Sequence, residues 1–165
     1  MNKLLVLVIY FLLNVFAYAQ EQSFSDWIVR GNAESEFIIA STANEDGTAA
    51  GIICSDSETC YPFVNVTTAC EEDGTYPFLF SFDDGIVADN LSCLISGDVY
   101  LFIFKTDQIE RMITSSKMGV AYGMADGNFK AAYFSLSGST KAYLELQKRL
   151  ETFDKVAPKR GSQIL

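Results

Sequence analysis

Apolar and polar residues alternate with a period of two along most of the chain between residues 26 and 136. The alternating segments are rich in β-branched and aromatic side chains, and turn residues such as Asp84-Gly85 and Asp126-Gly127 separate them. This period is typical of β-strands, whose successive side chains point to opposite faces of a sheet. We expect nine strands, over residues 26–30, 36–43, 49–54, 61–68, 77–82, 86–95, 99–105, 119–124 and 129–136.

The connections between these segments are short, which favours antiparallel hairpins over the longer crossovers that parallel strands need. Two segments have a helical pattern instead. Asp107 and Glu110 resemble a capping box, and a second helix begins at Ser139 or Thr140, with Arg149 among the charged residues that face water. We therefore expect a mainly β (α+β) fold. It would be an antiparallel β-sandwich or barrel-like sheet of about eight or nine strands with two helices, the second C-terminal.

The first nineteen residues have the pattern of a secretory signal peptide. A positive start at Lys3 precedes an apolar stretch over residues 4–16, and Ala17-Tyr18-Ala19 supplies the small residues of a cleavage site. An uncleaved membrane anchor is the alternative, but the stretch is shorter than the ~20 residues that a spanning helix needs. We expect residues 1–19 to be removed, residues 20–154 to form a single β-rich domain and residues 155–165 to form a flexible tail. The product would be periplasmic or secreted, with no membrane span.

Four cysteines lie in the exported part of the chain, Cys54, Cys60, Cys70 and Cys93. An even number of cysteines in an oxidising compartment suggests two disulfides. Three pairings are possible. We favour Cys54 with Cys60 and Cys70 with Cys93, because the first bond would close a short loop between two expected strands. A zinc site is the competing interpretation, but the chain has no C-x2-C pair and no histidine, so we expect no metal.

A row of aromatic residues is the one candidate ligand site that the pattern offers. Tyr76, Phe78, Phe80 and Phe82 alternate, so in a strand all four point to the same face. Such a row could form a platform for a sugar or an apolar ligand, or it could be the inner face of a packed sheet. We favour the packed face.

Acidic residues dominate the first part of the chain, whose formal net charge is −9 overall. Residues 20–104 contain fifteen acidic residues and one basic residue, whereas residues 105–165 contain ten basic and six acidic residues. Nucleic acids require clustered Lys and Arg, so they are excluded as partners. A cationic protein is the partner that this charge favours.

Histidine is absent, which removes the usual general base and the base of the serine triad. The adjacent carboxylates Asp83 and Asp84 would face opposite ways on a strand, so they could not flank one glycosidic bond. We expect no catalytic residue and no cofactor, and therefore no enzyme.

Three runs near the C-terminus carry a family resemblance: Val120 to Met124, Gly127 to Phe129 and Phe134 to Ala142. With their Ser-Leu-x-Gly turn before an alanine-containing helix, they resemble the end of small exported proteins like the invasion-associated locus B family. The earlier run over residues 60–82 is similar to uncharacterised bacterial periplasmic proteins. The resemblance implies a periplasmic or secreted, β-rich, disulfide-containing domain. The cysteine spacing differs from that family, so no role in host-cell entry is transferred.

These features together predict an exported, non-enzymatic interaction protein that is stabilised by disulfides. Two alternatives stay open. The first is an acidic inhibitor or neutralising partner of a basic enzyme such as a lysozyme, because a strongly acidic surface attracts cationic proteins. The second is a binder of sugars or small apolar ligands at the aromatic row.

Overall fold

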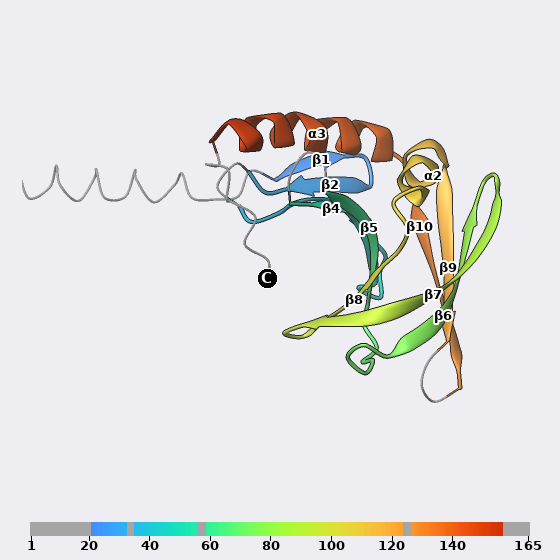
Figure 1. Ribbon diagram of the computed structural model, residues 1–165. Coiled ribbons are helices and arrows are strands. Elements are labelled where there is room, and N and C mark those ends of the chain that lie inside the picture. Colours follow the sequence, from blue (N-terminus) through green and yellow to red (C-terminus); the bar gives the residue numbers. More distant parts are fainter. Residues whose placement is uncertain (1–20, 33–34, 56–58, 124–126, 157–165) are drawn as a thin grey trace, which may run out of the picture.

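The computed structural model describes residues 21–32, 35–55, 59–123 and 127–156, and the expected signal peptide and tail lie largely outside them. Within these ranges the chain forms ten antiparallel strands in a single sheet (Figure 1). The order in space is β1-β2-β3-β4-β5-β8-β7-β6-β9-β10. The strands are β1 (Gln22–Phe24), β2 (Trp27–Arg30), β3 (Ile38–Ala43), β4 (Ala49–Cys54), β5 (Cys60–Val66), β6 (Thr75–Phe82), β7 (Gly85–Ser96), β8 (Val99–Ile103), β9 (Lys117–Gly123) and β10 (Phe129–Ser135).

The mainly β fold is therefore as expected, with one strand more than the sequence predicts. Nine of the strands overlap the expected segments, because their alternation reflects one face packed on a core. The additional strand is β1, which is only three residues long and pairs with β2. A segment of that length is too short for a recognisable period of two.

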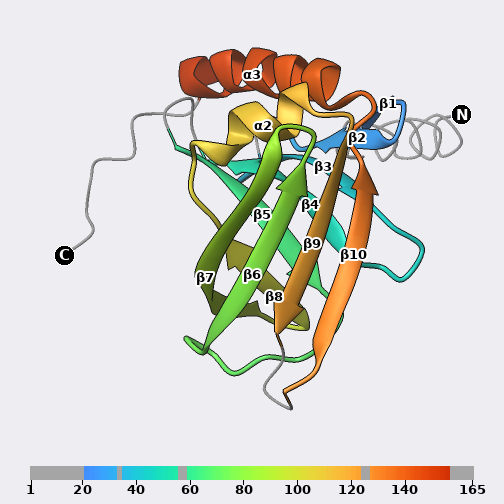
Figure 2. The same ribbon diagram turned by 90° about the vertical axis from the view of Figure 1, so that its right-hand side faces the viewer.

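The sheet bends sharply at β7, which divides it into two wings. Cys93 to Ser96 of β7 pair with β8, whereas Gly85 to Ser92 pair with β6. We call β1, β2, β3, β4, β5, β8 and residues 93–96 of β7 the first wing, and residues 85–92 of β7 with β6, β9 and β10 the second wing. Figure 2 shows the four strands of the second wing side by side, with both helices at one end. The sheet is not closed into a barrel, since its order begins at β1 and ends at β10.

Two hydrogen bonds bring the start of β2 close to the end of β10. The Trp27 indole Nε1 donates to the Ser135 carbonyl at 3.3 Å, and the Asp26 backbone N–H donates to the Ser137 carbonyl at 3.3 Å. The sheet therefore wraps round one hydrophobic core, to which both wings contribute. Its largest buried side chains include Trp27, Phe78, Phe80 and Phe102.

Two helices cover the end of this core that lies beside the start of β9 (Figure 2). They are α2 (Gln108–Thr114) and α3 (Ser139–Val156), and the latter packs against α2, β1, β2 and β3. Ala142, Leu146 and Leu150 form the buried face of α3. The predicted capping box is wrong, because the Asp107 side chain makes no capping hydrogen bond. That carboxylate instead accepts a hydrogen bond from Gln108 Nε2 at 2.9 Å.

Arg149 does not face water as the sequence predicts, since only 10% of its side chain is exposed. Its Nε donates to Glu145 Oε1 at 3.0 Å, and a guanidinium amino group donates to the Gly31 carbonyl at 2.8 Å. A third hydrogen bond reaches Gln22 Oε1 at 3.3 Å. The guanidinium thus fastens α3 to β1 and to the residue that follows β2.

Both disulfides of the favoured pairing are present. Cys54 and Cys60 are directly opposite each other on β4 and β5, with a Cα–Cα distance of 4.1 Å. Cys70 lies in the loop before β6 and is bonded to Cys93 on β7, with a Cα–Cα distance of 6.3 Å. The first bond closes a hairpin, and the second fixes a loop to the strand at which the sheet bends.

Candidate interaction face

The aromatic row of β6 lies on the inner face of the second wing. Tyr76, Phe78, Phe80 and Phe82 have exposed fractions of 7%, 1%, 1% and 7%. The Phe78 ring centroid lies 4.7 Å from that of Phe102, on the first wing. These four side chains are core residues that join the two wings, as the favoured interpretation predicts, and they offer no platform at the surface.

The opposite side of the same four strands is a surface without charged side chains over its three central rows. We call the twelve residues of these rows the outer face. The first row is Ile86, Ser81, Gly119 and Tyr133; the second is Ala88, Leu79, Ala121 and Ala131; the third is Asn90, Pro77, Gly123 and Phe129. The exposed side of an antiparallel sheet is ordinarily polar. The outer face differs from that pattern, because none of its twelve residues is charged.

Large apolar side chains protrude at the margins of the outer face. Ile86 is 74% exposed on β7, while Phe129 and Tyr133 are 71% and 76% exposed on the edge strand β10. Leu79, in the middle of the face, is 47% exposed. Isolated exposed apolar residues are common in proteins, but these belong to adjacent strands and form one patch.

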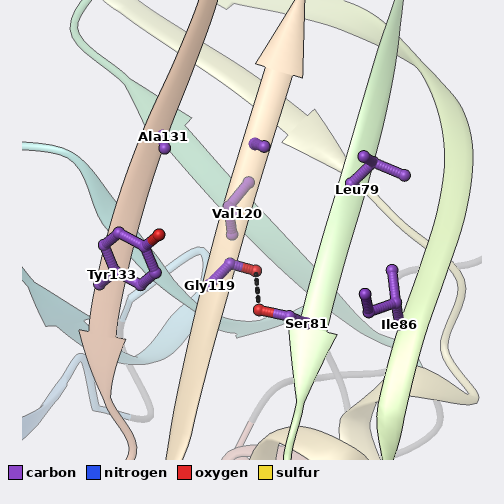
Figure 3. Close-up of a pocket in the computed structure, with 8 residues that line it drawn as sticks. Leu79, Ser81, Ile86, Gly119, Val120, Ala131 and Tyr133 are labelled. Carbon is purple, nitrogen blue, oxygen red and sulfur yellow. Dashed lines mark hydrogen bonds between the residues drawn. The ribbon is translucent and has the colours of Figure 1, made fainter.

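Small residues on β9 leave the centre of the face hollow. A shallow depression of about 190 Å³ is lined by Gly119 and Val120 of β9 together with Tyr133 and Ile86. Figure 3 shows the Tyr133 and Ile86 side chains on opposite sides of β9. A Cβ atom added at Gly119 would lie 2.4 Å from Ser81 Oγ and 3.2 Å from the Tyr133 ring, so a larger residue there would displace the Ser81 hydroxyl and partly fill the depression. A second depression of about 410 Å³ lies nearer the third row, beside Pro77, Asn90 and Phe129.

The two ends of the outer face differ in charge. At the helical end, Lys117 is the exposed outward residue of β9, and Arg111 Nε forms an ion pair with Asp84 Oδ2 at 3.3 Å. Asp83 accepts hydrogen bonds from the Ser116 backbone N–H at 2.6 Å and from its hydroxyl at 3.1 Å, which lower the pKa of the Asp83 carboxyl. At the other end the chain enters β6 through the acidic turn Glu71 to Asp73, whose side chains are exposed.

Further acidic residues lie at this second end. Gly47, in the turn that carries Glu45 and Asp46, lies close to Thr67, which follows β5. The strand register places the β7–β8 turn, with Asp98, beyond the Val66 end of β5. Hydrogen bonds from the Thr48 side chain and backbone N–H lower the pKa of the Asp46 carboxyl. Six exposed carboxylates therefore gather at the end of the sheet away from the helices: Glu45, Asp46, Glu71, Glu72, Asp73 and Asp98.

No cluster of three or more His, Cys, Asp or Glu residues that could hold a metal occurs in the described part of the chain. The helices seen in these ranges do not have the length and apolar character needed to cross a membrane. Asp83 and Asp84 lie in the turn between β6 and β7, where each contacts a different partner.

Comparison with known proteins gives a fold relationship and no family. No family model matches the sequence, and no curated protein matches it. Among solved structures, the chain is similar to invasion associated protein B from Bartonella henselae, with a TM-score of 0.55 and 14% identity. The similarity covers 83% of this chain and 99% of that one. At this identity the likeness shows a shared fold alone, which is the distant relation that the C-terminal resemblance implied.

The outer face is not among the candidate sites that sequence reasoning finds. Its signal was available in Gly119, Ala121 and Gly123, which alternate along one strand and all lack large side chains. Its meaning depends on the neighbours of β9. Those are Leu79 on β6 and Tyr133 on β10, which lie 42 positions before and 12 positions after Ala121 in the sequence.

Proposed function

We propose that the protein is an exported, non-enzymatic interaction protein whose outer face binds a protein partner. The observation that carries this proposal is the uncharged outer face itself, with its protruding margins and hollow centre. In a chain with 33 charged residues, the twelve positions of that face carry none, while carboxylates occupy the turns around it. Exposed apolar patches that are surrounded by polar residues commonly mark protein–protein interaction sites.

Export is supported by the N-terminal pattern and by the two disulfides, which form and persist in oxidising compartments. We place the protein in the periplasm or outside the cell on these grounds. A small-ligand site is less well supported, because the depressions of about 190 Å³ and about 410 Å³ are both open to solvent, whereas ligand clefts bury most of the surface of the ligand that they hold.

Site-specific photo-crosslinking in cells that produce the protein tests this function. A photo-reactive phenylalanine analogue replaces Leu79, and the matched control replaces Leu94, which is on β7 but belongs to the first wing. These leucines are 47% and 45% exposed, so they are equally accessible to random collisions. We expect discrete protein adducts at position 79 above the level at position 94. Equal adduct formation at the two positions would contradict the proposal.

The acidic end of the sheet favours a second candidate function, neutralisation of a basic enzyme. Carboxylates gathered at one end attract a cationic protein and accelerate its association, and salt weakens this attraction. The test is inhibition of a basic lysozyme at low and high salt. A variant with Glu71→Gln, Glu72→Gln and Asp73→Asn should inhibit less, whereas Glu110→Gln with Glu151→Gln on the helices should not differ from the unmodified protein. Absence of salt-sensitive inhibition would exclude this function for lysozymes.

A further inference from the structure

We infer that the partner of the outer face is a second copy of this chain, bound face to face with its strands antiparallel to those of the first. This inference rests on the proposed function, since it names the occupant of the same face. The two-fold axis would run across the strands, along the row of Ala88, Leu79, Ala121 and Ala131. Two sheets stacked in this way lie ~10 Å apart, as in a β-sandwich.

The centre of the face is compatible with a copy of itself. Around the axis lie only alanine and leucine side chains, so pairing two copies desolvates no charge there. Asp89 is on β7 between two of the rows, but it is opposite Phe78 on the inner side, and its carboxylate pairs with Lys105 Nζ at 3.2 Å. The acidic turns lie beyond the three rows, where water and salt weaken repulsion between the copies.

The shape of the face is also self-complementary under this axis. Rotation places the first row of one copy over the third row of the other. Ile86, a protruding residue of the first row, then lies over the depression beside Pro77 and Asn90. Tyr133 lies over the Phe129 ring of the second copy, and aromatic pairs of this kind add roughly 1 kcal/mol beyond the area that they bury.

The charges at the two ends decide the direction of the strands. At the helical end of the face, Lys117 and Arg111 offset the charges of Asp83 and Asp84, whereas Glu71, Glu72 and Asp73 give the other end a net negative charge. The antiparallel arrangement brings each acidic turn opposite the balanced end of the other copy, where Lys117 lies. A parallel arrangement would instead bring the two acidic turns to the same end of the dimer, which is unfavourable.

The dimensions of the face set the expected strength. The contact includes the three rows and the charged rows beyond them, so its length is that of the whole of β6, which has eight residues. Four strands at ~4.8 Å spacing and eight residues at ~3.4 Å rise give roughly 500 Å² for each copy, or about 1,000 Å² in total. Specific interfaces of that size are at the weak end of the range. We therefore expect a dimer that dissociates in the micromolar range, with concentration-dependent exchange between monomer and dimer.

Sedimentation velocity of the purified, disulfide-bonded protein tests this inference from about 1 to about 300 μM. We expect a shift from monomer to dimer across this range. L79K should be monomeric throughout, because the two introduced ammonium groups meet near the axis. L94K, a matched leucine outside the face, should dimerise like the unmodified protein. A monomer at all concentrations overturns the inference, and so does an equal effect of the two variants.

The strand direction is tested by exchanging the charges. K117E should weaken dimerisation roughly tenfold, because the contact occurs twice in a two-fold dimer. Adding E72K to K117E should restore it. The antiparallel arrangement is overturned if K117E does not weaken dimerisation. It is also overturned if adding E72K to K117E does not restore dimerisation.

The two proposals can fail separately. A purified protein that stays monomeric, together with adducts between position 79 and a different protein in cells, rejects the second copy and retains the proposed function. A monomer in solution, together with no adducts at position 79 above the level at position 94, rejects both. A different partner whose capture weakens with salt would be the cationic protein that the overall charge favours.

Discussion

Arg149 is the residue whose role differs most from its place in the sequence pattern. It occupies a position that helical periodicity assigns to water, yet its guanidinium is almost covered and joins α3 to the first strands. Periodicity describes the helix alone, whereas the Gly31 carbonyl approaches from a segment more than a hundred residues earlier. No local pattern contains that information.

Replacing Arg149 with methionine should lower the free energy of unfolding by about 2 kcal/mol, because Glu145 loses its nearer partner, with Lys148 Nζ left at 3.9 Å, and the Gly31 carbonyl loses its hydrogen bond. The control is Lys148→Met one position earlier, where 78% of the side chain is exposed and the expected change is under about 0.5 kcal/mol. Urea denaturation followed by circular dichroism measures both values. Similar losses in the two variants would contradict the role assigned to Arg149.

Asp83 should make stability depend on pH in the acidic range. Its pKa is lowered from 3.8 by the hydrogen bonds from Ser116, so the ionised carboxylate stabilises the folded state. The stabilisation by ionised Asp83 is complete at pH values above the pKa of the unfolded chain. It is lost as the pH falls from that value through the lower pKa of the folded protein. Asp83→Asn should therefore flatten the fall of melting temperature below about pH 4. Asp98→Asn, in the exposed β7–β8 turn, serves as the control.

Among the structural elements, the positions of the strands in the sequence could be predicted, but the order in which the strands pair in the sheet could not. An apolar run between the turn residues 44–48 and the polar residues 55–59 locates β4 at its observed bounds. Alternation places the aromatic row of β6 on one side. Alternation does not reveal that β6 lies between β7 and β9, and the outer face exists only because of that arrangement.

The two disulfides should contribute unequally to stability. The bond between Cys70 and Cys93 spans a sequence separation of 23, and that between Cys54 and Cys60 a separation of 6. In the chain-entropy description, closing the longer loop stabilises by about 3 kcal/mol and closing the shorter loop by about 2 kcal/mol. Replacing both cysteines of each pair by serine, with stability measured by urea denaturation, tests this order. A larger loss from the Cys54 and Cys60 pair would contradict it.

At the scale of the whole molecule, the two wings share one core, although they differ in their outer surfaces. Phe80 on the second wing stacks on Phe104, which follows β8 of the first wing, with ring centroids 4.5 Å apart. Phe102 contacts both Tyr76 and Phe78 across the same space. Neither wing can therefore keep its inner face buried without the other.

A single cooperative unfolding transition should follow from this shared core. Trp27 is fully buried where β2 meets the end of β10, so its fluorescence reports on the contact between the wings, whereas far-ultraviolet circular dichroism reports on all ten strands. We expect the two signals to have the same midpoint in urea. Separate midpoints would show that the wings unfold independently. The control is the same comparison in Phe80→Ala, where both midpoints should fall together by an amount corresponding to about 3 to 5 kcal/mol.

The packing of α3 has a consequence for the order in which the chain becomes stable. This helix is the last element of the described chain, and it covers β1, β2 and β3, which are the first strands to be synthesised. Those strands have no cover for their apolar inner face until some 120 further residues have been made. A chain that crosses a membrane from its N-terminus would therefore remain unfolded during most of its translocation. Folding would be completed only when the final helix emerges on the far side.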